Sequence, residues 1–211
     1  MDITWLGHSS IKIVSRDVTL VTDPYPDSIG FSMGAESADI VTVSNDHPNH
    51  SETERFVGDP RVLQGPGQFE VRGYNIRGMG TKFEEPERER RINTVFTFRS
   101  EGISVCHLGD LKQRLTPAQL DGLGAVDVLV APAGGRCTLE VREVVALANQ
   151  MAPKIIIPVH YGYETTTEIL EPLERILTEL GVAEATPLPR LNVTQTNMPR
   201  EMQAVVLRKS S

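Results

Sequence analysis

The sequence predicts an α+β protein in which strands and helices form mixed layers around one core. Short β-branched or alternating runs, each closed by turn residues, fill the first third of the chain and are typical of strands. In the second half, strand-like runs alternate with segments of helical periodicity. The length of 211 residues favours a single domain over residues 1–211, and 39% hydrophobic with 23% charged residues is an ordinary globular composition.

The first part of the chain is predicted to consist of strands joined by turns. Strands are expected over residues 3–6, 10–14, 18–22, 39–44, 61–63 and 70–76. Prolines and glycines between residues 24 and 34 indicate a loop before the fourth strand. The charged run EEPERERR at residues 84–91 is interpreted as a solvated loop without a function of its own.

Strands and helices alternate in the second half. Strands are predicted over residues 94–99, 103–107, 126–131 and 154–159. Thr116, Pro117 and Gln119 supply an N-cap, a first-turn proline and a capping-box partner for a short helix that ends near Leu123. Apolar residues at helical spacing predict two more helices, over 138–151 and from about 169 to a stop at Gly181, although a proline at 172 leaves the start of the last one open.

Charge and composition exclude several classes of partner. With 21 basic and 28 acidic residues, the net charge of -7 repels nucleic acid and anionic lipid, so neither is an expected partner. No apolar run approaches the roughly 20 residues that cross a bilayer, and an acidic residue at position 2 does not resemble a secretory signal. We therefore expect a cytoplasmic protein whose partner is a small-molecule substrate, with Cys106 and Cys137 reduced; the pattern carries no signal for an oligomeric state.

Histidines and acidic residues gather where predicted strands end. None of the five histidines lies in a segment that is predicted to be helical. One polar cluster, at residues 45–50, follows a strand; a second contains His107 and Asp110; a third contains His160 and Tyr161. If these strands share a sheet, their ends can meet at one edge, which is where α and β proteins usually place a site.

The residue types in these clusters suit a divalent cation. Imidazole nitrogen and carboxylate oxygen are common ligands, and a catalytic zinc usually keeps three protein ligands and one open position. His50, Asp110 and His160 supply such a set. Taken singly, a histidine after a strand is more often a packing or turn residue, so the hypothesis depends on all three coming together.

Five segments of the chain, in order, carry a resemblance to a known family: ITWLGHSS, TDPYP, SNDHPNH, CHLGDL and PKIIIPVHYG. Together they resemble the metallo-β-lactamase-fold hydrolases, in particular a small lactonase-like branch of cytoplasmic metal-dependent hydrolases. The resemblance implies a four-layer αβ/βα sandwich of two mixed β-sheets with helices outside. It also implies a two-metal site at one edge.

The resemblance also implies that the first of the two metal pockets is incomplete. The family motif H-x-H-x-D-H falls on residues 45–50, where Asn45 and Asn49 stand in place of a histidine and an aspartate. The first pocket would further need a histidine from the middle of the chain, near Phe83, but no histidine occurs between residues 51 and 106. Only His47 and Asp110 of that pocket are present.

The second pocket is nearly complete, because only Asn49 departs from the family pattern. We therefore expect at most one zinc or manganese ion, held by His50, Asp110 and His160 with help from His47. Asp110 and His47 are the predicted catalytic residues. Residues expected to orient ligands or to contact substrate are Asn45, Asn49, His8, Asp23, His107 and Tyr161. A hydrogen-bonded turn role is an equally plain interpretation of His8 and Asp23, and a packing role is the favoured interpretation of Tyr161.

Two functions follow from this set of residues. The first is a metal-dependent hydrolase of an ester, lactone or phosphoester that works with a single ion. The second is a catalytically degenerate family member, with a binding or regulatory role and no ion. The surviving ligands favour the first and the substitutions at positions 45 and 49 favour the second.

Overall fold

Two mixed β-sheets form the body of the protein, as the family resemblance implies. The computed structural model describes residues 1–85 and 88–210, with side chains described outside 83–91. Within these residues one sheet has six strands and the other seven. The sheets meet across an apolar core and are cross-linked at their ends, for example where the Ser15 and Ser100 hydroxyls lie 3.0 Å apart.

The first sheet is antiparallel at one side and parallel at the other. Its strands lie in the order β12-β1-β2-β3-β4-β5. Their bounds are β1 Asp2–Gly7, β2 Ser10–Ser15, β3 Val18–Thr22, β4 Ile40–Val43, β5 Arg61–Gln64 and β12 Leu191–Asn192. The strands β3, β4 and β5 run parallel, so their carboxyl ends point to the same edge.

The second sheet has the same mixed character. Its order is β13-β11-β10-β9-β8-β7-β6, parallel from β13 to β9 and antiparallel from β9 to β6. The bounds are β6 Gly67–Val71, β7 Tyr74–Glu85, β8 Arg88–Ser100, β9 Ile103–His107, β10 Val128–Pro132, β11 Ile155–Val159 and β13 Gln203–Ala204. Every residue of β9, β10 and β11 is buried, which explains why these strands are apolar without alternation.

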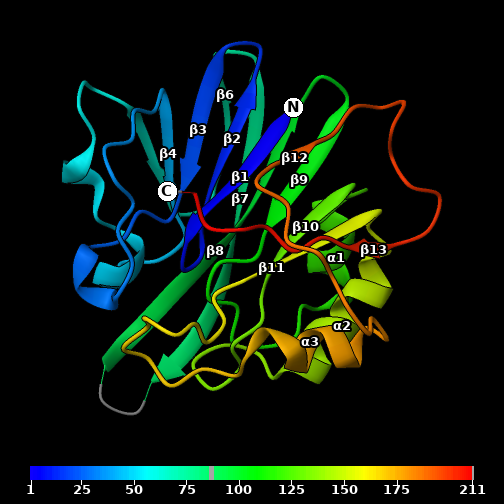
Figure 1. Ribbon diagram of the computed structural model, residues 1–211. Helices are drawn as coiled ribbons and strands as arrows, with labels where there is room; N and C mark the ends of the chain where they lie inside the picture. Colours follow the sequence, from blue (N-terminus) through cyan, green and yellow to red (C-terminus); the bar gives the residue numbers. More distant parts are fainter. Residues whose placement is uncertain (86–87, 211) are drawn as a thin grey trace.

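The α-helices of the described chain each follow a parallel strand of the second sheet, namely β9, β10 and β11. They are α1 (Pro117–Leu123), α2 (Val141–Met151) and α3 (Leu173–Glu179), and they lie together beside β10 and β11 in Figure 1. The capping box predicted at Thr116 and Gln119 is confirmed. Pro172 is the N-cap of α3, because proline can precede a helix but cannot continue one. Short 3-10 helices are η1 (Asp27–Ile29), η2 (Pro48–His50) and η3 (Thr53–Arg55).

Two predicted segments differ from the structure. Residues 70–76 form a hairpin corner, since Arg72 and Gly73 take positive φ angles of 46° and 83° between β6 and β7. The expected loop at 84–91 is largely strand, because β7 continues to Glu85 and β8 begins at Arg88; residues 86 and 87 lie outside the described residues. His50, which was not expected in any helix, ends the 3-10 helix η2.

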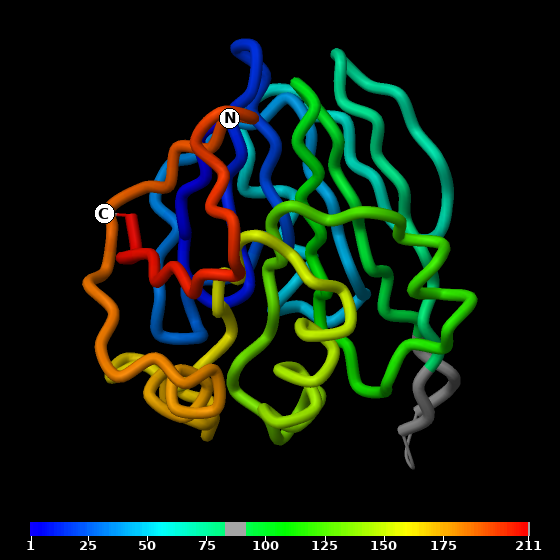
Figure 2. The backbone as a smooth tube through the Cα atoms, turned by 90° about the vertical axis from the view of Figure 1, so that its right-hand side faces the viewer, coloured from blue at the N-terminus to red at the C-terminus, as the bar shows by residue number. Residues whose placement is uncertain are grey.

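The C-terminal segment returns to the first strand. In Figure 2 the red end of the tube runs beside the blue strand β1, and the Ser210 backbone N–H donates to the Trp5 carbonyl over 2.9 Å. The edge strand β12 pairs antiparallel with β1. Among the helices of the described chain, none is long and apolar enough to cross a membrane.

Candidate metal centre

Histidines and carboxylates converge at the edge where the parallel strands of both sheets end. Asp23 follows β3, His50 lies in the turn after β4, Asp110 lies three residues beyond β9, and His160 follows β11. His8 joins them from the turn between β1 and β2. The strands do not share one sheet, as the sequence led us to suppose, because β4 belongs to the first sheet and β9 and β11 to the second. Their carboxyl ends, the usual place for a site in such sheets, still meet at one edge.

Three of these residues have an unusual backbone. His8, Asp23 and His160 take positive φ angles of 49°, 42° and 51°, a left-handed region that residues with a Cβ rarely adopt. The His160 backbone N–H donates to the His8 carbonyl over 2.9 Å and so ties two of them together. Such backbone conformations persist where the surrounding structure enforces them, and they cluster at functional sites.

Asp110 joins the two histidines with which it was predicted to act. Its Oδ2 lies 3.0 Å from His50 Nε2, and its Oδ1 lies 3.2 Å from His160 Nδ1. Gly109 makes this turn possible, because a Cβ there would fall 2.4 Å from Asn93 Oδ1. The same Asn93 oxygen accepts the Asp110 backbone N–H over 2.8 Å. The hydrogen bond between the Asp110 backbone and Asn93 thus fixes the position of the Asp110 carboxylate.

Asp23 fixes the orientation of His50. Its Oδ2 lies 2.9 Å from His50 Nδ1, and its two oxygens accept the backbone N–H and the hydroxyl of Ser44. Both Asp23 and His50 are only 1% exposed. The Asp23 carboxylate thus holds Nδ1 of His50 and directs Nε2 toward Asp110.

The charges of the site depend on one another. Burial alone would lower the pKa of His50, but the charge of Asp110 and hydrogen bonds to Asp110 and Asp23 raise that pKa to about 9. Burial opposes ionisation of Asp110 as well, but the neighbouring His50 and His160 hold the pKa of Asp110 well below its usual range. Burial and the nearby charge of His160 lower the pKa of His8 to about 3. His8 is therefore a neutral imidazole, which is the form that binds metal.

The donor atoms present fit a divalent cation. Three of them, His8 Nε2, His160 Nδ1 and Asp110 Oδ1, are buried and make no hydrogen bond, although His160 Nδ1 and Asp110 Oδ1 form an ion pair with each other at 3.2 Å and His8 Nε2 lies 3.6 Å from Glu168 Oε2. Buried polar atoms are rarely left in that state, and a cation is one way to satisfy them together. His8, His50 and His160 also each bring one ring nitrogen within 4.8 Å of the others. The residues that could hold an ion are thus His8, His50, Asp110 and His160.

Glu168 belongs to the same cluster, although the sequence analysis did not include it. Its Oε2 lies 3.3 Å from His160 Nε2 and 3.6 Å from His8 Nε2, and its Oε1 accepts the Asn49 side-chain amide over 2.6 Å. Hydrogen bonds with His160 and His8 hold the pKa of Glu168 below its usual range. Cys137, His160 and Glu168 form a second group whose ligand atoms lie within 4.8 Å of one another. Glu168 lies in a loop segment, TTTEIL, with no spacing that marks it in the sequence.

The motif residues that depart from the family form a compact turn of their own. Asn45 Oδ1 accepts the His47 backbone N–H over 2.9 Å, and the Asn45 amide donates to Ser44 Oγ over 3.1 Å. His47 Nδ1 accepts the Asn49 backbone N–H over 3.2 Å, which caps η2. The His47 and His50 rings lie 6.3 Å apart. His47 lies outside the three-histidine group, and its predicted ligand and catalytic roles stay predictions.

His107 and Tyr161 have contacts of a different kind. His107 Nδ1 accepts the Gly109 N–H, so its Nε2 carries the proton and donates to the Ser9 carbonyl over 2.8 Å. Nε2 therefore holds β9 to the turn that carries His8, and Nδ1 is used within the turn at Gly109. The Tyr161 ring packs against Trp5 at 5.2 Å between centroids and lines a separate cavity of about 390 Å³.

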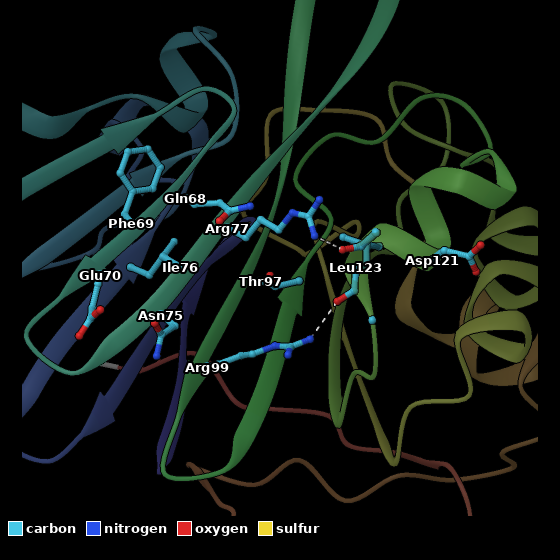
Figure 3. A pocket seen from close by; sticks show the side chains of 12 residues that line it. Gln68, Phe69, Glu70, Asn75, Ile76, Arg77, Thr97, Arg99, Asp121 and Leu123 are labelled. Atoms are coloured by element: carbon cyan, nitrogen blue, oxygen red, sulfur yellow. Dashed lines mark hydrogen bonds between the residues drawn. The ribbon is translucent and has the colours of Figure 1, made fainter.

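A larger cavity, of about 590 Å³, lies on the outer face of β6, β7 and β8 beside α1 (Figure 3). Arg77 and Arg99 reach across it and donate to the carbonyls of Gly122 and Leu123 at the end of α1. These contacts satisfy carbonyls that a helix end leaves free. The cavity contains none of the histidines, so its size does not make it the site.

Two mixed sheets with histidines and carboxylates at the edge where their parallel strands end define a protein of the metallo-β-lactamase fold. A model of the family described as "Beta-lactamase superfamily domain" matches residues 2–160. The chain belongs to this family, and the resemblance stated from the sequence is confirmed.

Known relatives cover nearly the whole chain. A crystal structure from Thermotoga maritima, assigned to the metallo-β-lactamase superfamily, is 34% identical, with a TM-score of 0.81 and coverage of 98% of this chain and 97% of that one. A UPF0173 protein of Pyrococcus abyssi is 29% identical over 77% of this chain and 84% of its own length. A UPF0173 metal-dependent hydrolase of Methanoregula boonei is 25% identical over 90% of this chain and 99% of its own length.

Proposed function

We propose that the protein is a metal-dependent hydrolase that binds one divalent ion, zinc or manganese, and cleaves an ester, a lactone or a phosphoester. The observation that carries the proposal is that His8, His50 and His160 each bring one ring nitrogen within 4.8 Å of the others, with Asp110 Oδ1 3.2 Å from His160 Nδ1. His50 Nε2 lies 3.0 Å from the other oxygen of the same carboxylate, Asp110 Oδ2. Relatives named metal-dependent hydrolases and the Thermotoga maritima structure, described as a candidate zinc-dependent hydrolase, support the same activity.

A bound divalent cation supplies Lewis acidity and lowers the pKa of a coordinated water. The chain itself supplies the rest. Asp23 holds the proton on His50 Nδ1, so that Nε2 faces Asp110, and the low pKa of Asp110 keeps this carboxylate ionised as a ligand. The side chains of Asp110 and Glu168 are 14% and 32% exposed, whereas the histidines are nearly fully buried, so substrate approaches past these two acids.

Single-ion chemistry is favoured over the family's two-ion arrangement because the first pocket has lost donors. Asn45 uses its side chain within the turn, and no histidine occurs between residues 51 and 106. Without a second ion, the water cannot be shared between two cations, so we expect slower hydrolysis than in a relative with a complete motif.

The test is a metal analysis of untagged protein combined with a substrate panel. About one equivalent of zinc or manganese should remain after dialysis, and hydrolysis of a simple ester, a lactone or a phosphodiester should require it. An ester such as p-nitrophenyl acetate, an aromatic lactone and bis-p-nitrophenyl phosphate separate the three substrate classes. Protein treated with a chelator is the control.

The substitutions at positions 45 and 49 favour a second candidate, a degenerate member with a binding or regulatory role. Protein that retains no ion and shows no added hydrolysis when zinc or manganese is supplied would support this candidate and reject the hydrolase. One retained ion without turnover of any substrate class would support a binding role.

A further inference from the structure

The two histidines beside Asp110 are each contacted by a second carboxylate. His50 has Asp23 at its Nδ1, over 2.9 Å, and presents Nε2 to Asp110. His160 has Glu168 at its Nε2, over 3.3 Å, and presents Nδ1 to Asp110. The two rings thus point opposite nitrogens at the same carboxylate. This arrangement repeats the pattern by which an outer carboxylate fixes the tautomer of a metal-binding histidine.

Asn49 holds Glu168 in that position. The Asn49 amide donates to Glu168 Oε1 over 2.6 Å, which leaves Oε2 for His160. An aspartate at position 49, as in the family motif, would place one carboxylate against another at this distance. Asparagine supplies the N–H donor that Glu168 accepts. Asparagine at position 49 therefore fits a role in holding Glu168 and not a role as a metal ligand.

The backbone around Glu168 is anchored to the site. The Thr167 N–H donates to the Ile29 carbonyl over 3.3 Å, and the Glu171 N–H donates to the Gly134 carbonyl over 2.8 Å. Gly30 lies directly under this loop, because a Cβ there would fall 1.7 Å from the Thr165 carbonyl oxygen. The carboxylate therefore comes from a loop segment held on both sides, and not from a freely moving side chain.

We propose that Asn49 and Glu168 form a relay that positions His160, doing for this histidine what Asp23 does for His50. In this proposal residue 49 does not bind the ion and acts on the site through Glu168. Glu168 is a positioning residue that keeps the His160 proton on Nε2 and leaves Nδ1 for a cation. The inference rests on the proposed function, because it needs an ion at this site.

The first experiment measures zinc binding to metal-free, full-length protein by competition with a chromophoric chelator. Glu168→Ala should weaken zinc binding about 10- to 100-fold, the usual effect of losing an outer partner of a ligand. Glu168→Gln, which keeps an acceptor for the His160 N–H, should recover part of that loss. Glu164→Ala, which removes an exposed acid from the same loop, is the matched control and should bind zinc as the wild type does.

The second experiment distinguishes the relay from a ligand at position 49. Asn49→Asp should weaken zinc binding at least threefold, because it sets two carboxylates against each other. If residue 49 were a ligand, as in the family motif, the same substitution would strengthen binding, and that result would overturn the proposal. Asn49→Asp combined with Glu168→Gln restores a donor–acceptor pair in the opposite sense and should bind zinc more tightly than Asn49→Asp alone.

The third experiment measures the tautomers of His160 and His50 by NMR. A two-bond ¹H–¹⁵N NMR spectrum of the zinc-loaded protein should show His160 protonated at Nε2 and His50 protonated at Nδ1. In Glu168→Ala the His160 signals should broaden or change tautomer while those of His50 stay as they were. A merely structural role for Glu168 would leave both unchanged.

These outcomes separate the two proposals. Wild-type protein that binds no zinc overturns the proposed function and the relay with it. Wild-type protein that binds zinc, with Glu168→Ala binding equally well and an unchanged His160 tautomer, overturns only the relay. Equal losses in Glu168→Ala and Glu164→Ala would show a general charge effect and would also overturn it.

Discussion

The two histidines that flank Asp110 are held by different parts of the protein. His50 and its partner Asp23 are both 1% exposed; Asp23 directly follows β3, and His50 ends the 3-10 helix η2. His160 is 2% exposed, but its partner Glu168 is 32% exposed and comes from a loop. The Asp23–His50 pair is buried in the core, whereas the Glu168–His160 pair lies on the side of the site that is open to solvent. Loss of the first should therefore affect folding and metal binding, and loss of the second should affect metal binding alone.

The largest effect is expected at the residue common to both pairs. Asp110→Asn keeps the shape of the side chain but removes the charge that faces His50 and His160. Zinc affinity should fall by at least about 100-fold, more than for loss of an outer partner. Metal content after dialysis and competition titration measure the change. Asp121→Asn, an exposed acid on α1, is the control; retention of a full equivalent by Asp110→Asn would contradict the site.

Substitution of the two motif histidines tests which of them binds the ion. His50→Ala should abolish tight zinc binding, because His50 is buried with Nε2 against Asp110. His47→Ala should change the zinc dissociation constant less than about threefold, because its Nδ1 already caps η2 and the ring lies outside the three-histidine group. Isothermal titration with zinc compares them. Equal losses of zinc affinity in the two variants would support His47 as a ligand, as the sequence predicts.

Asp23 and Glu168 should differ in their effect on stability. Asp23→Asn should lower the free energy of unfolding by about 2–4 kcal/mol, because it disrupts a buried ion pair and its hydrogen bonds to Ser44. Glu168→Ala should leave the unfolding free energy of metal-free protein unchanged within about 0.5 kcal/mol, since Glu168 is partly exposed. Urea unfolding of metal-free protein gives both values. A loss of unfolding free energy in Glu168→Ala as large as in Asp23→Asn would show that the two pairs stabilise the fold equally.

The smallest effect concerns the two thiols. Burial raises the pKa of Cys106 on β9 to about 12, so this thiol stays protonated at pH 8. Cys137, whose Sγ lies 4.0 Å from His160 Nε2, is only partly buried. In native protein a disulfide reagent should modify Cys137 and leave Cys106 unmodified, whereas both react in guanidinium. Because Cys137 lies near the site, zinc should slow its modification; fast modification of Cys106 would contradict the burial.

Much of the fold could be predicted because its signals are local. The strand runs at 10–14, 18–22 and 103–107 lie within one residue of the observed strands, since alternation, β-branching and turn residues act over a few positions. The corner at Arg72 and Gly73 was missed, because Arg72 takes a left-handed conformation that its residue type does not indicate.

For the site, the sequence by itself determined which residues gather at one edge, because His50, Asp110 and His160 each follow an apolar run that is recognisable as a strand. Only the tertiary structure decided how they are held. Glu168 reaches Asn49 across 119 positions of the chain, and the same carboxylate lies 3.6 Å from His8 Nε2. The physical reason is that ring orientation and hydrogen-bond pairing depend on contacts between distant loops, which no local pattern of residues encodes.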